Sequence, residues 1–137
     1  MNNILIKSAT LIFPDHDKHG QVVDVWIDNG IIKDVSLHGE KTYEQVTIID
    51  GENQYLAPGF FDMNANFGEP GLESKETISS GCAAAVAGGF TGVAVQPNTN
   101  PALHSKGEVA MVVNLSKDNL VSVHPVGAIS KDRAGND

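Results

Sequence analysis

Two amide side chains stand at the end of a strand-like run near the middle of the chain. Asn64 and Asn66 follow the apolar pair Phe60-Phe61 and precede the turn sequence Glu69-Pro70-Gly71. Alternate residues of a strand point to the same face, so both amides are expected on one side. An amide carbonyl is a weak metal ligand compared with a neutral imidazole nitrogen. Chemistry is expected at this strand end, but the two amide residue types suit it poorly.

The histidines form no recognisable ligand set in the sequence. His16 and His19 lie three apart in the polar segment 15–20, and as ligands they would need carboxylate or sulfur partners nearby. We interpret both as solvated. His124 lies in an apolar run just before a proline, which favours a hydrogen-bonded core histidine over a ligand. The remaining two lie in polar connections without a partner pattern: His38 and His104.

Composition narrows the class of protein. The chain has 137 residues, 41% of them hydrophobic, and a formal charge of −8. This charge argues against nucleic acid, whose binding requires a basic surface. No apolar run approaches the ~20 residues that a membrane span needs. The single cysteine, Cys82, cannot form an internal disulfide and sits among alanines, so we expect a buried thiol and a cytoplasmic protein.

Strands must dominate the first part of the chain. Apolar residues alternate with polar ones in the runs 4–13, 22–28, 31–37 and 46–50. The pair Asn29-Gly30 between two of these runs is the strongest local signal for a hairpin, because both turn residues need positive φ. Residues 1–56 are therefore predicted to be the N-terminal strands of a small β-sandwich that borrows a covering layer from elsewhere.

Strands and helices alternate in the rest of the chain, from residue 57 to 137. Strands are expected over 60–67, 90–96 and 120–129, with helices over 74–88 and from 105 to about 115 or 120. Ser105 and Glu108 have the spacing of a capping box. This order predicts a parallel α/β sheet with right-handed crossovers. Three such strands leave an edge unpaired, so we expect this chain to be the front portion of something larger.

The order of motifs from Tyr55 to Arg133 resembles that of the dihydroorotases, within the cyclic amidohydrolase superfamily. The shared motifs are Ala57-Pro58-Gly59-Phe60-Phe61-Asp62, Glu69-Pro70-Gly71, Lys75-Glu76-Thr77-Ile78 with Gly81, Ala84-Ala85, Gly88-Gly89-Phe90-Thr91, Gln96-Pro97-Asn98-Thr99-Asn100-Pro101 and Gly127-Ala128-Ile129. The resemblance implies zinc-type metal enzymes of pyrimidine biosynthesis that open or close a cyclic amide such as dihydroorotate. It also implies a (β/α)₈ TIM barrel with a side sandwich. Such a barrel takes about 250 residues, so only its first three β/α units fit into residues 57–137.

Three positions depart from the family at the end of the first barrel strand. The family has His-x-His there, two ligands of the catalytic metal centre, and two residues later an arginine that binds the substrate carboxylate. This chain has Asn64, Asn66 and Gly68. Asn98 does match a family residue that contacts the substrate carboxylate, although it is equally well interpreted as a turn former. The resemblance therefore implies degenerate metal positions, no catalytic residue and no cofactor held by this segment.

Three functions remain open on these residues. The first is a dihydroorotase-like protein without activity, retained as an oligomeric assembly partner, for which the family suggests aspartate transcarbamoylase. The second is an active cyclic amidohydrolase that uses a single metal held by ligands beyond residue 137. The third is a self-sufficient binding module of 137 residues. The loss of three site residues within an otherwise well-matched frame favours the first.

Overall fold

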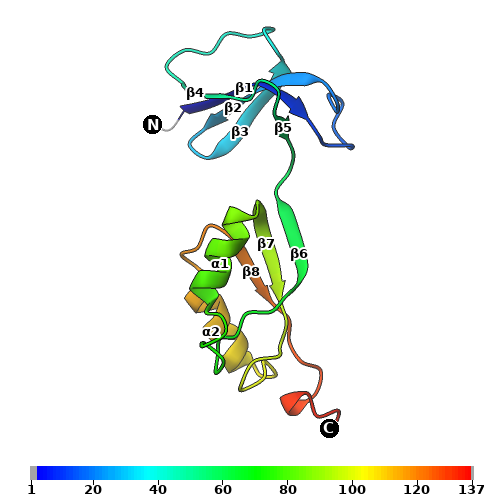
Figure 1. The fold of residues 1–137 in the computed structure, drawn as a ribbon, viewed down its shortest axis with the longest axis vertical. Coiled ribbons are helices and arrows are strands. Elements are labelled where there is room, and N and C mark those ends of the chain that lie inside the picture. Colours follow the sequence, from blue (N-terminus) through cyan, green and yellow to red (C-terminus); the bar gives the residue numbers. More distant parts are fainter. Residues whose placement is uncertain (1–2, 137) are drawn as a thin grey trace. The chain divides into compact units, whose positions relative to one another are not determined.

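A computed structural model describes residues 3–136, and the chain divides into two compact units (Figure 1). The first unit is Met1–Pro58 and the second is Gly59–Asp137. Each unit has its own buried apolar cluster. The two are described separately below. No helix among residues 3–136 is long and apolar enough to cross a membrane.

The first unit is a five-stranded sheet with β1 at its centre. β1 pairs antiparallel with β2, which pairs antiparallel with β3. On its other side β1 pairs in parallel with both β4 and β5. The strands are β1 (Asn3–Leu11), β2 (Val22–Asp28), β3 (Ile31–Leu37), β4 (Thr47–Asp50) and β5 (Tyr55–Leu56). Sequence periodicity predicts four of them and misses β5, which has only two residues and leaves no periodic pattern.

The turn between β2 and β3 forms as predicted. Asn29 and Gly30 both have positive φ, at 49° and 78°. These values suit the two-residue hairpin turn whose twist matches that of the flanking strands. The apolar cluster of this unit is formed by side chains of β1, β2, β3 and β5: Leu11, Val23 and Val25 are buried, with Ile6, Ile27, Val35 and Leu56 packed against them.

The second unit is a parallel sheet of three strands in the order β6-β7-β8 (Figure 1). Its elements are β6 (Phe60–Ala65), α1 (Ile78–Ala87), β7 (Phe90–Val95), α2 (Lys106–Ser116), β8 (Ser122–Pro125) and the 3₁₀ turn η1 (Lys131–Arg133). One apolar cluster joins both helices to the sheet, through residues such as Cys82, Val95 and Val112. The predicted α/β class with a parallel sheet is confirmed, and these three strands do not close a barrel among themselves.

The two helices begin at capped residues. Thr77 precedes α1 and its hydroxyl accepts a hydrogen bond from Ser80 N, while Ser105 and Glu108 form the predicted capping box before α2. The prediction that α1 begins at residue 74 is wrong. Residues 74–77 instead approach the helix as a turn, because Thr77 adopts an extended conformation and its side chain satisfies an N–H of the first helical turn.

Candidate functional site

The three amides singled out in the sequence lie at the carboxyl ends of β6 and β7. Asn64 is the penultimate residue of β6, and Asn66 directly follows that strand. Asn98 lies three residues beyond β7. Because the strands are parallel, their carboxyl ends meet at the same edge of the sheet. The Asn98 side-chain Nδ2 donates a hydrogen bond to Asn66 Oδ1. The structure therefore brings Asn66 and Asn98 together.

The backbone around these amides is held by local hydrogen bonds. Asn66 Nδ2 donates to the carbonyl of Asn64 at 3.0 Å. Asn64 N donates to Asp62 Oδ1 at 2.8 Å, so the Asp62 carboxylate accepts a backbone hydrogen bond within β6. Gln96 N donates to Ala65 O at 2.9 Å and continues the β6–β7 pairing past the strand ends. The side chain of Asn66 thus uses its donor and its acceptor within the chain.

The donor set at this edge does not fit a catalytic metal. Asn66 Oδ1 already accepts from Asn98, and Asn64 offers one further amide oxygen. Residues 3–136 contain no group of three or more His, Cys, Asp or Glu side chains that could hold a metal ion. Zinc-type sites need imidazole, thiolate or carboxylate ligands. The resemblance implies a metal that these residues are not suited to bind.

Gly68 occupies the position at which the resemblance implies an arginine. It is buried, its N–H donates to Glu76 O at 3.1 Å, and its carbonyl accepts from Leu72 N at 2.8 Å. Both polar backbone groups of this residue are therefore engaged inside the loop between β6 and α1. The carboxylates nearest along the chain, Asp62 and Glu69, add negative charge rather than the cation that a substrate carboxylate needs.

The same loop is pinned to the elements on either side. Glu69 Oε2 accepts a hydrogen bond from Ile78 N at the start of α1, at 2.9 Å. Asn100 N, in the loop after β7, donates to Pro70 O at 2.9 Å. Gly71 N donates to Glu73 Oε1 at 2.7 Å, and this bond lowers the pKa of Glu73. The Glu69-Pro70-Gly71 motif thus acts as a structural frame, whatever chemistry the strand end carries.

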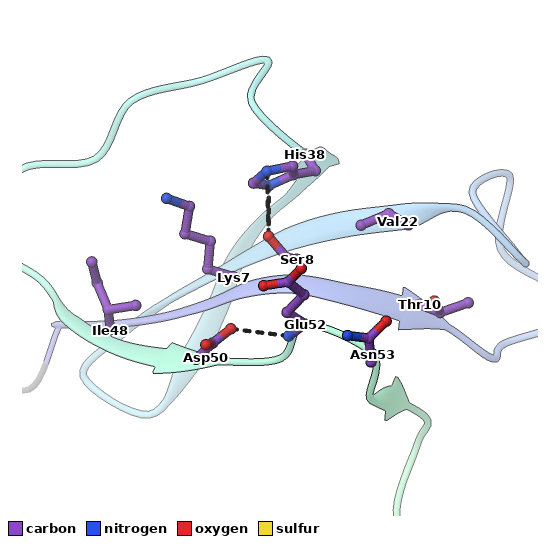
Figure 2. Close-up of a pocket in the computed structure, with 9 residues that line it drawn as sticks. All are labelled: Lys7, Ser8, Thr10, Val22, His38, Ile48, Asp50, Glu52 and Asn53. Carbon is purple, nitrogen blue, oxygen red and sulfur yellow. Dashed lines mark hydrogen bonds between the residues drawn. The ribbon is translucent and has the colours of Figure 1, made fainter.

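A second polar cluster lies in the first unit and was not expected from the sequence. His38 Nδ1 lies 2.9 Å from Asp24 Oδ1, and Ser8 Oγ lies 3.1 Å from His38 Nδ1 and 3.3 Å from Nε2. Figure 2 shows the Ser8 hydroxyl facing the His38 ring at the rim of a hollow of about 700 Å³. Ser, His and Asp in contact are the groups of a nucleophilic triad.

The geometry of this cluster is structural rather than catalytic. A triad serine bonds the imidazole nitrogen that Asp leaves free. Here Ser8 Oγ is slightly closer to Nδ1, the nitrogen that already faces Asp24. Asp24 is 3% exposed and also accepts from Ser8 N at 2.9 Å and Gly39 N at 3.1 Å. Its carboxylate therefore holds the bulge in β1, where Ser8 has φ of 65°, to the end of β3.

The environment of Asp24 keeps its carboxylate ionised. Burial acts to raise the pKa of Asp24, but hydrogen bonds from His38, Ser8 N and Gly39 N outweigh burial and hold the pKa below its ordinary value. The available sequence signal was a lone acid inside the apolar run Val22-Val23-Asp24-Val25. Its partners lie 16, 14 and 15 residues away, so no local pattern could identify them.

The other histidines do not gather into a site. The Nδ1 atoms of His16 and His19 lie 3.1 Å from the backbone nitrogens of Lys18 and Phe13, so these rings serve the turn that carries them. The prediction that His124 is a core residue is wrong for the described chain: it is exposed in β8, with its ring centroid 5.4 Å from that of Phe61. Cys82 is buried as predicted, and burial raises the pKa of its thiol.

Comparison with known proteins agrees with this architecture. A family described as "Dihydro-orotase-like" matches residues 53–137. The dihydroorotase of Trichlorobacter lovleyi is 39% identical over 134 residues, covering 97% of this chain and 31% of that protein. The dihydroorotase of Elusimicrobium minutum is 42% identical over 132 residues, covering 96% of this chain and 30% of that protein. The chain therefore spans about a third of the length of the curated relatives that it matches.

Solved structures share the fold at lower identity. The L-hydantoinase from Arthrobacter aurescens superposes with a TM-score of 0.74 at 19% identity, covering 93% of this chain and 28% of that one. A D-hydantoinase from a Thermus species gives a TM-score of 0.66 at 21% identity, again covering 93% and 28%. With the family match over more than half of its residues, the chain belongs to the dihydroorotase-like family of the amidohydrolases.

Proposed function

We propose that this chain is a dihydroorotase-like protein whose metal site and substrate-carboxylate site at the end of β6 no longer function. The observation that carries the proposal is the bonded pair Asn66–Asn98 at the strand ends. Two amides that hydrogen-bond to each other hold no metal that could activate a water near neutral pH. They also provide no cation for a substrate carboxylate. The frame motifs around it are retained and fully bonded, as Glu69 and Asn100 illustrate.

A family scaffold without this chemistry is best explained by a structural or assembly role. The partner we propose is aspartate transcarbamoylase, in an oligomeric complex in the cytoplasm. The family resemblance supports the choice of partner, and the single cysteine, as a buried free thiol, supports a reducing compartment. The acidic charge of −8 makes nucleic acid an unsuitable partner.

Metal content and turnover together test the proposal. The purified protein should contain zinc far below one equivalent by inductively coupled plasma mass spectrometry, and should not turn over dihydroorotate or carbamoyl-aspartate at micromolar enzyme. The matched variant carries Asn64→His and Asn66→His, which supplies two imidazole ligands at the same positions. The proposal expects this variant to gain metal at most.

One result would contradict the proposed loss of function. Stoichiometric metal with turnover in the unmodified protein would establish the alternative, an active amidohydrolase with a single metal held elsewhere. Loss of that turnover in the double histidine variant would then locate the working site at the end of β6. The assembly role is tested separately, by sedimentation of the protein with aspartate transcarbamoylase, where two unshifted peaks would exclude a stable complex.

A further inference from the structure

We propose that the loop between β6 and α1 is built around the absence of a side chain at residue 68, so that replacing Gly68 alone cannot restore a carboxylate-binding arginine. This inference rests on the proposed loss of function at the same site and deepens it. The arginine implied at position 68 is excluded by the surrounding backbone as well as by the change of residue type.

The space around Gly68 carries the inference. A Cβ atom placed on Gly68 would lie 2.3 Å from Leu72 O and 2.8 Å from Glu76 O. Real Cβ carbons essentially never lie within 3.0 Å of such atoms, so any other residue requires the loop to move. The obstructing atoms are main-chain oxygens, which cannot rotate away as the end of a long side chain can.

Both obstructing oxygens are themselves held in place. Glu76 O accepts the Gly68 N–H at 3.1 Å, and Leu72 O accepts Lys75 N at 2.9 Å. The loop also cannot shift as a unit, because Gly71 packs against the backbone of Asn100, where an added Cβ would lie 1.7 Å from the carbonyl oxygen. Displacing the loop would therefore break hydrogen bonds to α1 and to the loop after β7.

The closed backbone at Gly68 bears on carboxylate binding at this strand end. The polar groups next to Gly68 along the strand end are the neutral amides Asn66 and Asn98 and the acid Asp62, and the loop adds Glu69. With position 68 closed, an arginine at this position cannot supply a cation to the strand end. A carboxylate ligand such as dihydroorotate therefore finds no bidentate arginine at position 68.

Stability measurements on single variants test the inference. Gly68→Ala should lower Tm by about 5 °C or more, since it forces a collision in a pinned loop. Gly127→Ala is the matched control, because a Cβ there meets no atom within 4 Å, and its Tm should change by less than about 2 °C. Equal melting temperatures for the two variants would overturn the inference.

A second measurement avoids dependence on a variant that fails to fold. In the unmodified protein, amide hydrogen exchange at Gly68 and Leu72 should be slowed at least about 100-fold relative to an unstructured chain, because both N–H groups are bonded inside the loop. Unprotected amides at both positions would overturn the inference. Dihydroorotate turnover by the unmodified protein would contradict the proposed function and leave these two predictions about the loop unaffected.

Adding arginine to the double histidine variant tests the carboxylate site directly. The triple variant Asn64→His, Asn66→His, Gly68→Arg should melt about 5 °C or more below the double variant, and should not bind dihydroorotate more tightly by calorimetry. A triple variant that is as stable as the double variant and binds the carboxylate at least about 10-fold more tightly would overturn the inference.

Discussion

The protein has two polar clusters, and neither has the role that its residue types or its position suggest. In the first unit Asp24, His38 and Ser8 have the residue types of a catalytic triad, yet their hydrogen bonds fasten a bulge to the end of a strand. At the end of β6 the family resemblance predicts chemistry, yet Asn66 and Asn98 bond only to each other and to the backbone. Reactive residue types therefore need the right geometry, and the right position needs the right residue types.

Burial explains why the clusters should differ in energy. Asp24 is 3% exposed and accepts from two backbone N–H groups, so its removal leaves both groups without this acceptor. The Asn66–Asn98 hydrogen bond is exposed, and water can replace either partner.

The largest effect is expected at Asp24. Asp24→Ala should lower the free energy of unfolding by about 3 kcal/mol, because Ser8 N and Gly39 N lose a charged acceptor. Asp15→Ala, at an exposed turn residue, is the control and should change it by less than about 0.5 kcal/mol. Urea denaturation measures both. An Asp24 variant as stable as the control would mean that the cluster does not hold the sheet.

Acid should act through the same carboxylate. The folded-state pKa of Asp24 lies below its ordinary value, so its contribution to stability is complete above pH 4 and is lost as the pH falls through the folded-state pKa. The free energy of unfolding of the unmodified protein should therefore drop over this acid range more steeply than that of Asp24→Asn. Parallel curves for the two proteins between pH 5 and pH 2 would exclude Asp24 as the source.

The cap of α1 is expected to have a moderate effect. Thr77→Ala removes the acceptor of Ser80 N and should lower the free energy of unfolding by about 1 kcal/mol. Ser79→Ala, an exposed change within the same helix, should be neutral or slightly stabilising because alanine has the higher helix propensity. If Thr77→Ala proves neutral, the loop before α1 depends less on this cap than the hydrogen bonds indicate.

The exposed amides should contribute least. Asn66→Ala and Asn98→Ala should each cost about 0.5 kcal/mol, and a double-mutant cycle should give a coupling below about 0.5 kcal/mol. A coupling well above 1 kcal/mol would place the Asn66–Asn98 pair beside Asp24 as a structural cluster.

The smallest effect is expected for the reactivity of the Ser8 hydroxyl. A fluorophosphonate probe should label Ser8 no faster than it labels other exposed serines, because the hydroxyl faces the His38 nitrogen that Asp24 already occupies. Mass spectrometry of probe-treated protein and of the Ser8→Ala variant measures this. Selective labelling of Ser8 that requires His38 would reverse our interpretation of the cluster.

Local sequence was sufficient where neighbouring residues decide the structure. Asn29-Gly30 predicts its hairpin and Ser105 with Glu108 predicts the start of α2, because turn and cap preferences depend on residues within one or two turns of the chain. The strand and helix order of the second unit followed from periodicity in the same way. The boundaries were less accurate, and α1 begins at Ile78 because Thr77 caps it.

The sequence by itself determined the family, the order of elements, and the presence of amides and glycine where ligands and an arginine are implied. Only the tertiary structure decided what those residues do. Asn98 bonds Asn66 across 32 residues, Asp24 finds His38 across 14, and the collision at Gly68 is with the backbone of Leu72 and Glu76. Such contacts depend on how the folded backbone brings residues together. A pattern of residue types predicts the strands and helices but not these contacts.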